Sequence, residues 1–117
     1  MVIQKFEDII AWQKAQDLAV EIFSDFGELR HWGFRDQICN AATSISNNIA
    51  EGFDRSSDAD FSRFLYIAMG SASETKSMLY LALRLKFISD DRQKMLIEQS
   101  DEVSRIIRGL IKSLTKK

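Results

Sequence analysis

The chain has 117 residues, a formal net charge of -1 at pH 7 and a pI near 5.8. Its length predicts one globular domain over residues 1–117, and its charge argues against a strongly electropositive nucleic-acid-binding protein. Hydrophobic residues make up 45% of the chain, proline is absent and there are only 5 glycines. Since turn-rich β folds need both of these residue types, the composition predicts an all-α protein.

The first predicted helix covers residues of about 6–28. Its apolar residues recur every three or four positions, which is the period of an α-helix. They are Ile9, Trp12, Ala15, Ala19, Ile22 and Phe26. Glu7 and Asp8 fall in the expected first turn, where carboxylates interact favourably with the helix dipole. The helix is expected to stop near Gly27.

The second predicted helix covers residues of about 34–53, and its last part carries many polar side chains. The inward positions are Phe34, Ile38, Ala41, Ile45 and Ile49. The stretch SISNNIAEGFDR, from Ser44 to Arg55, contains the end of this helix, and its glycine, Gly52, would alone suffice as a stop signal. The additional polar residues therefore predict a packing device, a ligand site or a partner surface.

The third and fourth predicted helices cover residues of about 58–87 and 90–115. Ser57 or Asp58 is expected to cap the third helix, and Ser89 the fourth, by accepting a hydrogen bond from a free backbone amide. The connections between the four helices are short, so consecutive helices should be antiparallel neighbours. The sequence thus predicts an up-down-up-down antiparallel four-helix bundle.

Small residues interrupt the third helix at Gly70, Ser71, Ala72 and Ser73. A glycine inside a helix costs roughly 1 kcal/mol relative to alanine, so a reason for it is expected. One interpretation is a close helix crossing within the bundle. The other is a contact between subunits, for which Leu18, Phe23, Tyr66 and Met69 lie off the main apolar stripes.

The residues needed for catalysis or for a metal site are scarce. His31 is the only histidine, so one chain cannot supply a paired-histidine metal site. The Glu28-x-x-His31 spacing of di-iron bundles occurs once, past Gly27, and those proteins need a second copy. Cys39, the only cysteine, is expected to be a small helix residue. We therefore expect a protein that is not an enzyme and binds no cofactor or metal.

Location is predicted from the same features. The start MVIQKFEDII lacks a basic segment followed by an apolar core, so a secretion signal is not expected. No apolar run is long enough to span a bilayer, and a single cysteine fits a reducing compartment. The prediction is a cytoplasmic protein with no membrane partner.

The carboxylates Glu51 and Glu74 are expected to act structurally. Antiparallel packing would place Glu51 near the start of the third helix and Glu74 opposite residues 37–41. There they would accept hydrogen bonds from Asn48, Gln37, Arg55 or a serine and fix the helix register.

Two stretches, SISNNIAEGFDR and FSRFLYIAMGSASE, resemble the bundle proteins encoded by intervening sequences of bacterial 23S ribosomal RNA genes. This S23 ribosomal protein-like family is related to the accessory variability determinant proteins of diversity-generating retroelements. The residues that carry the resemblance are Ser44-Ile45, Asn48 to Gly52, Arg55, Phe61, Phe64-Leu65, Ile67-Ala68, Gly70-Ser71 and Glu74. Phe6, Trp12, Ala15 and Leu18 add a likeness in the first helix.

The resemblance implies a ring of identical subunits, usually a homopentamer, in which the polar motif sets the register of the second and third helices. The retroelement relatives bind structured nucleic acid and an RNA-binding enzyme, a reverse transcriptase, through a basic surface. Where many members carry two arginines, this chain has Cys39 and Asn40. The corresponding positive charges are therefore missing from the second helix.

One group of basic residues remains as a candidate nucleic-acid site. Arg105, Arg108, Lys112 and Lys116 step by three and four along the last helix, with Lys117 beside them and no acid after Glu102. Such a stripe can contact phosphates, or it can simply complement the helix dipole in solvent. Two functions stay open: an oligomeric accessory that binds structured RNA or an RNA–protein complex, and a protein-interaction scaffold without a nucleic-acid role.

Overall fold

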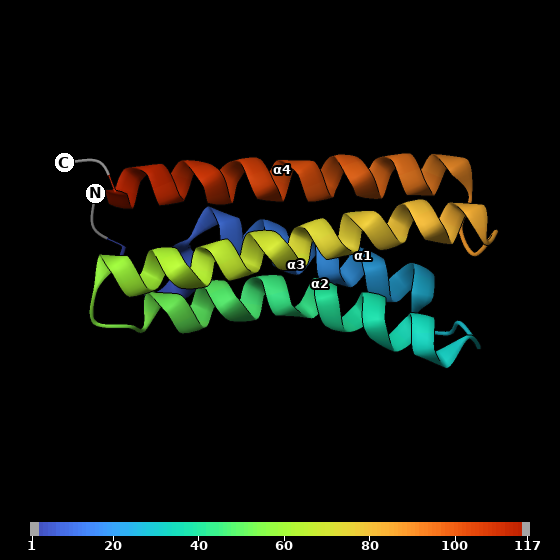
Figure 1. Ribbon diagram of the computed structural model, residues 1–117, viewed down its shortest axis with the longest axis horizontal. Helices are drawn as coiled ribbons and strands as arrows, with labels where there is room; N and C mark the ends of the chain where they lie inside the picture. The colour runs from blue at the N-terminus through green and yellow to red at the C-terminus, as the bar shows by residue number, and fades with distance from the viewer. Residues whose placement is uncertain (1–2, 116–117) are drawn as a thin grey trace.

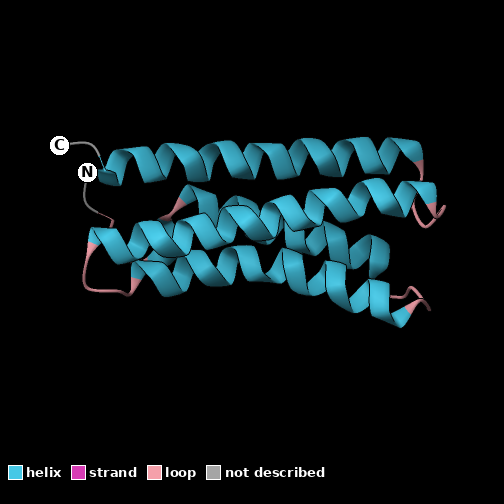
Figure 2. Ribbon diagram, viewed as in Figure 1, coloured by secondary structure: helices cyan, strands magenta, loops and turns pink. Residues whose placement is uncertain are grey.

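The computed structural model describes residues 3–115, which form an antiparallel bundle of four helices (Figure 1). The helices are α1 (Ile10–Phe26), α2 (Trp32–Phe53), α3 (Asp58–Arg84) and α4 (Asp90–Thr115), preceded by a 3-10 turn, η1 (Phe6–Asp8). Only loops join the helices in this part of the chain (Figure 2). The all-α four-helix prediction is confirmed.

Each helix packs on two neighbours around a square. α1 and α3 both pack against α2 and α4, whereas no Cα atoms of α1 and α3 lie within 8 Å of each other in the described residues. The two helices therefore occupy diagonally opposite corners of a bundle that measures 46 × 21 × 19 Å. Each exposes its outer surface on a different side of the molecule.

The first helix begins later than predicted. Ile9 has φ -77° and ψ 120°, an extended conformation that separates η1 from α1. This break turns the Ile9 side chain into the core, where it is only 2% exposed, and the Phe6 ring lies 5.4 Å from the Trp12 ring. Tertiary packing thus overrides the helix propensity of the first turn. Glu7 and Asp8 belong to η1 and not to the first turn of α1.

The other helix ends also follow packing and capping. α2 begins at Trp32, two residues before the predicted start, and α3 ends at Arg84, three residues before the predicted end. After α3, Lys86 adopts φ 64°, and the Phe87 amide donates to the Ala82 carbonyl at 2.9 Å. This left-handed turn ends the helix as a Schellman motif, although no glycine is present. Ser57 and Ser89 accept hydrogen bonds from the amides of residues 60 and 92, so both predicted caps are confirmed.

The core runs the length of the bundle between all four helices. Its largest fully buried side chains include Phe26 and the leucine, isoleucine and valine residues at inward positions of every helix. Leu18 is also fully buried, so the expectation that it forms a subunit contact is wrong. Leu18 follows Ala15 by three residues and precedes Ile22 by four, and therefore lies on the inward stripe. None of the helices, within the described residues, is apolar enough over a sufficient length to cross a bilayer.

Candidate functional site

α2 and α3 approach each other closely at Gly52. A Cβ atom built on this buried glycine would lie 2.5 Å from the Phe64 Cβ and 3.1 Å from the Phe61 Cδ1. Van der Waals contact between carbon atoms begins at about 3.5 Å, so a side chain at this position would push the helices apart. Gly52 therefore has a steric role in helix packing.

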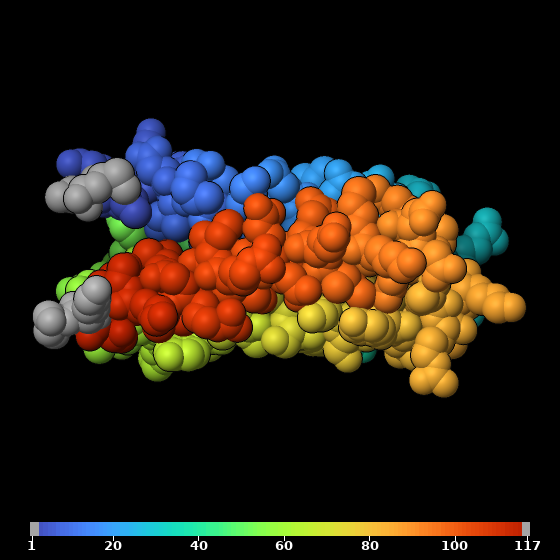
Figure 3. Space-filling view, turned by 90° about the horizontal axis from the view of Figure 1, so that it is seen from above, coloured from blue at the N-terminus to red at the C-terminus, as the bar shows by residue number. Residues whose placement is uncertain are grey.

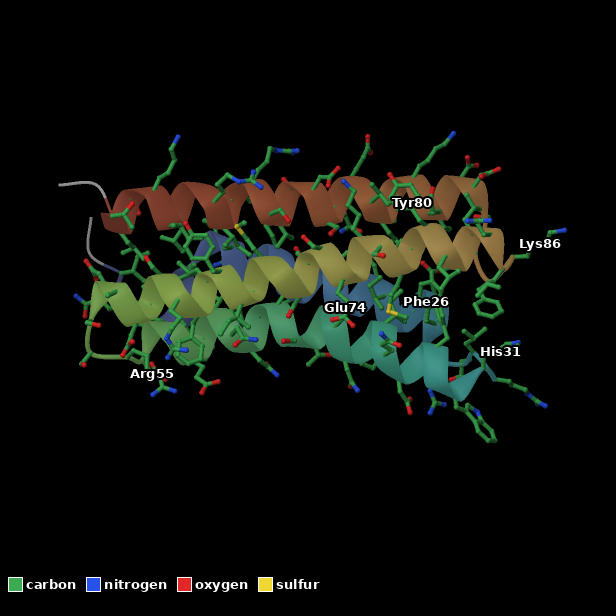
Figure 4. All side chains as sticks on the ribbon, viewed as in Figure 1. Phe26, His31, Arg55, Glu74, Tyr80 and Lys86 are labelled. Atoms are coloured by element: carbon green, nitrogen blue, oxygen red, sulfur yellow. The ribbon has the colours of Figure 1, made fainter. Side chains whose placement is uncertain are left out.

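Arg55 holds the same corner from outside. Its guanidinium carbon lies 4.7 Å from the centroid of the Phe64 ring, as does that of Arg63, which are cation–π distances. The Arg55 Nη2 also donates to Glu51 at 3.0 Å, one helical turn earlier. Figure 4 places Arg55 at the end of the bundle where α2 meets the α3 start. Arg55 and Arg63 thus cover the ring of Phe64, whose side chain is only 7% exposed.

Asn48 belongs to a second device, a chain of three polar side chains that links α2 to α3. The Asn48 Nδ2 donates to the Ser44 carbonyl and to the Ser44 hydroxyl, both at 2.8 Å. The Ser71 hydroxyl on α3 donates to the same Ser44 hydroxyl at 3.0 Å. We call these three residues the hydroxyl–amide chain. Each is half-buried, so its satisfied hydrogen bonds favour one register of the two helices.

Each of the two carboxylates accepts a hydrogen bond from one of the partners predicted for it, although both carboxylates are exposed. Glu74 is exposed and accepts one hydrogen bond, at 3.3 Å, from Gln37, which is one of the partners expected for it (Figure 4). Glu51 is exposed as well, and its partner among the described residues is Arg55. A buried network around Glu51 and Glu74 is therefore absent from this part of the chain, whereas the hydroxyl–amide chain that links the same two helices is half-buried.

Gly70 does not take part in a close helix crossing. It is exposed, and a Cβ atom built on it would meet no atom within 4 Å. Its neighbours Ser71 and Ala72 face the bundle, where the Ala72 carbonyl accepts a hydrogen bond from Ser100 at 3.2 Å. Of the stretch 70–73 predicted to lie at a close helix crossing, Ser71 and Ala72 therefore do face neighbouring helices, whereas Gly70 lies on the open outer surface of α3.

Ion pairs between helices were not foreseen from the sequence. Arg92 of α4 donates to Asp25 at 2.6 and 2.9 Å and to Glu21 at 2.7 Å, and both acids belong to α1. These hydrogen bonds, first to Asp25 and then to Glu21, raise the pKa of the Arg92 guanidinium. Lys76 of α3 contacts Asp101 of α4 at 2.8 Å, which raises the pKa of the lysine. These pairs hold α4 against both of its neighbours.

Cys39 is buried, and the ring of His31 packs against another aromatic ring. Burial raises the pKa of the Cys39 thiol; the charge of Arg35 lowers it by less, and the charge of Asp36 raises it by less still. His31 and Glu28 lie in the connection between α1 and α2, and the His31 ring stacks on Phe87 with centroids 4.6 Å apart. Between residues 3 and 115, no cluster of three or more His, Cys, Asp or Glu side chains could hold a metal ion.

The basic stripe on α4 is solvent-exposed. Arg105, Arg108 and Lys112 are exposed, and none of them forms a salt bridge within the described residues. By contrast, the acids of the preceding turn are paired, Glu102 with Lys14 and Asp101 with Lys76. We call these three cations the α4 cationic stripe. The predicted continuation, Lys116 and Lys117, lies outside the described residues.

A cleft of about 510 Å³ opens at the end of the bundle where α2, α3 and α4 meet the N-terminal segment. Apolar side chains form half of its lining, and Arg55 and Asp58 are its charged members. The apolar residues are Ile3, Phe53, Phe61, Leu110 and Leu114. Its polar lining residues are Arg55, Ser56, Ser57, Asp58 and Ser113, and Ser57 already accepts a hydrogen bond from the Asp60 amide as the cap of α3.

Comparisons with known proteins agree with this architecture. Residues 7–109 match the family model described as 23S rRNA-intervening sequence protein. The structure is similar to a crystal structure of a protein with unknown function from the S23 ribosomal protein family of Bacteroides thetaiotaomicron. The TM-score is 0.83 and the sequence identity 29%, over 88% of this chain and 99% of that one. No match was found among curated proteins.

Proposed function

Since the chain belongs to the family of 23S rRNA-intervening sequence proteins, we propose that it is a non-catalytic, homo-oligomeric accessory protein that binds structured RNA or an RNA–protein complex. In this proposal the α4 cationic stripe contacts phosphates. The description of the family refers to an intervening sequence in 23S rRNA, which makes structured ribosomal RNA the first probe to use.

The observation that carries the proposal is the absence of acidic partners along the stripe. Six other bases in the described residues are paired with carboxylates, namely Lys14, Arg35, Arg55, Arg63, Lys76 and Arg92. Arg105, Arg108 and Lys112 keep their charges free, one turn apart on one face. Lysines and arginines of this kind bind phosphates by releasing condensed counterions, without sequence preference.

The corresponding surface of α2 supports the same assignment by contrast. Cys39 is buried there, Asn40 is uncharged and exposed, and the nearby Arg35 is paired with Asp36 at 2.9 Å. The middle of α2 therefore presents no free positive charge. Of these two surfaces, we expect the α4 cationic stripe to make the phosphate contacts.

A gel-shift titration at low salt tests the proposal with structured ribosomal RNA fragments. Replacing Arg105, Arg108 and Lys112 together by glutamine should weaken RNA binding at least tenfold. The slope of log affinity against log salt concentration should also become shallower, by roughly 0.7–0.9 for each phosphate contact that is lost. The matched control replaces three other exposed, unpaired bases, and should change the affinity much less. These are Lys5, Arg30 and Lys94.

Two outcomes would refute parts of this proposal. If both triple variants shift RNA as well as the parent does, RNA binding stands but the stripe is rejected as its site. If the parent gives no shift at micromolar protein, RNA binding is refuted. The second candidate, a protein-interaction scaffold, would then remain; the exposed apolar side chains on α1 and α3 favour it.

A further inference from the structure

A second cleft, of about 410 Å³, lies between α3 and α4 near the start of α4. Its volume falls in the range of small-molecule sites, roughly 300–1,000 Å³. The boundary between α3 and α4 belongs to the face that Figure 3 shows, with α1 along the opposite edge. We call this cleft the α3–α4 pocket. Its lining residues are Tyr80 of α3 and Gln93, Lys94, Ile97 and Glu98 of α4.

An ion pair between the two helices shows how the walls of the pocket face each other. Lys76 contacts Asp101 at 2.8 Å, and α3 runs antiparallel to α4 (Figure 1). Tyr80, one turn further along α3, therefore lies level with Ile97, one turn earlier on α4. Figure 4 places Tyr80 at the boundary of these two helices. Tyr80 and Ile97 thus belong to opposing walls of the pocket.

Gln93 is the unusual member of the lining. It is polar but only 4% exposed. Its side-chain amide forms no hydrogen bond with any other group of residues 3–115. A polar group that is buried without a protein partner lowers stability, so a reason for its presence is expected. The amide offers the pocket one acceptor and two donors in a single plane.

The lining selects a flat, uncharged ligand that forms hydrogen bonds. Tyr80 is 53% exposed, so its ring has surface free to stack on a planar group. Ile97 supplies an apolar contact on the α4 side. A glutamine amide pairs with an edge that presents a donor beside an acceptor, as adenine does with its N6 amino group and N7. The charges of Lys94 and Glu98 are opposite, so the lining has no net charge with which to hold a phosphate.

We propose that the α3–α4 pocket binds a nucleobase, preferably adenine, which stacks on Tyr80 and pairs with the side-chain amide of Gln93. The base belongs either to an unpaired nucleotide of RNA or to a free nucleotide, since both present the same group. The base-binding site itself does not depend on the α4 cationic stripe. Only RNA as the source of the base rests on the proposed function.

The position of the pocket favours RNA as that source. Arg108 follows Ile97 by eleven residues, which is three helical turns, so both lie on the same side of α4 about 16 Å apart. A strand whose phosphates follow the α4 cationic stripe therefore extends along this side of the helix toward the pocket. Phosphate contacts carry no sequence information, whereas a base in the pocket adds a preference for adenine.

A nuclear magnetic resonance titration of isotope-labelled protein tests the site with three probes. The probes are AMP, ribose phosphate and single-stranded oligoadenylate. AMP and oligoadenylate should shift the side-chain amide signals of Gln93 and the backbone amide signal of Tyr80. Ribose phosphate lacks the base and should shift neither. If AMP shifts these signals and oligoadenylate does not, the base pocket stands and the free nucleotide is its ligand.

Two substitutions separate recognition from folding. Gln93→Met keeps the length of the side chain and removes its hydrogen-bonding groups, so AMP binding should weaken by at least about fivefold. The melting temperature should stay the same or rise, because an apolar side chain replaces a buried polar one. Tyr80→Leu should also weaken AMP binding by at least about fivefold, through the loss of stacking. The matched control is Tyr66→Leu, at the other tyrosine of α3, which is also exposed and should keep the parent affinity.

Three results would overturn the proposal. The first is that neither AMP nor oligoadenylate moves the Gln93 signals. The second is that ribose phosphate moves them as much as AMP does, which would indicate a phosphate site. The third is a Gln93→Met variant that binds AMP as the parent does, and a lower melting temperature in that variant would give the amide a structural role instead.

The gel-shift experiment separates this inference from the RNA proposal. A parent protein that shifts no RNA but binds AMP at Gln93 removes RNA as the source and keeps the base pocket. A parent protein that shifts RNA, oligoadenylate included, while its Gln93 signals stay unchanged keeps RNA binding and rejects the pocket.

Discussion

Replacing Gly52 by alanine tests the close approach of α2 and α3 directly. The added Cβ atom would lie 2.5 Å from the Phe64 Cβ, about 1 Å inside van der Waals contact. A Cβ atom is fixed by its backbone, so no change of side-chain rotamer in Phe64 relieves the overlap. The helices must separate instead, and the packing of Phe61 against the corner must loosen.

Two opposing effects determine the size of the change. Alanine gains about 1 kcal/mol over glycine in a helix interior, and overpacking a tight contact typically costs about 1–3 kcal/mol. The contact also supports Arg55 over the Phe64 ring, which is lost when the ring moves. The cost should exceed the gain, so we expect Gly52→Ala to lower the free energy of unfolding by about 1–2 kcal/mol.

The matched control is the same substitution at Gly109 of α4, where a Cβ atom meets nothing within 4 Å. There only the propensity term acts, and the free energy of unfolding should rise by up to about 1 kcal/mol. Urea denaturation followed by circular dichroism, at one protein concentration, measures both variants. If Gly52→Ala proves as stable as Gly109→Ala, the steric account of the Gly52 contact is wrong.

Three further predictions follow from local geometry. Lys86→Gly should raise the free energy of unfolding by about 0.5–1 kcal/mol, because φ 64° is strained for lysine but not for glycine. Lys86→Ala should give no such increase, and the midpoints of urea denaturation will compare the two variants. Glu74→Ala should lower the free energy of unfolding by less than about 0.5 kcal/mol, since the hydrogen bond between Glu74 and Gln37 is exposed. Ser44→Ala should lower it by about 1–2 kcal/mol, because it breaks the hydroxyl–amide chain. Equal losses of stability in thermal melts of the two variants would contradict this prediction. Burial raises the pKa of Cys39, so stability should be retained below the pKa of the unfolded thiol and fall as pH rises from there through the folded pKa; a Cys39→Ala variant that shows the same fall would refute the assignment.

Helix number, order and direction were predictable because the apolar residues recur with helical period and the connections are short. The helical period of the sequence also predicts that the two motif glycines, Gly52 and Gly70, face in different directions. Gly52 follows Ile45 by seven residues and Ile49 by three, on the inward stripe of α2, whereas Gly70 lies two residues from Ala68 and from Ala72. The helical period thus directs Gly52 inward and Gly70 outward, as the structure has them.

Other features depend on residues that are distant in the sequence. Arg92 meets its two acids 67 and 71 positions earlier in the chain, and periodicity does not reveal such a pairing. The start of α1 was wrong for a related reason, since Ile9 leaves the helical conformation to reach the core. For the candidate site, the exposure of the α4 cationic stripe followed from its period, but the absence of acidic partners became visible only once α1, α3 and α4 were assembled.

The cleft at the end of the bundle has a consequence for the opening motions of the protein. Ile3 and Leu114 line it together, although more than a hundred residues separate them in the chain. Bringing them together closes the longest loop of the fold, and the entropic cost of loop closure grows with the logarithm of loop length. Ile3, Leu110 and Leu114 are only partly buried there, because they line the cleft. Amide protons near residues 110–114 should therefore exchange with solvent sooner than those near Leu18, through openings that release this corner and leave the rest of the bundle folded.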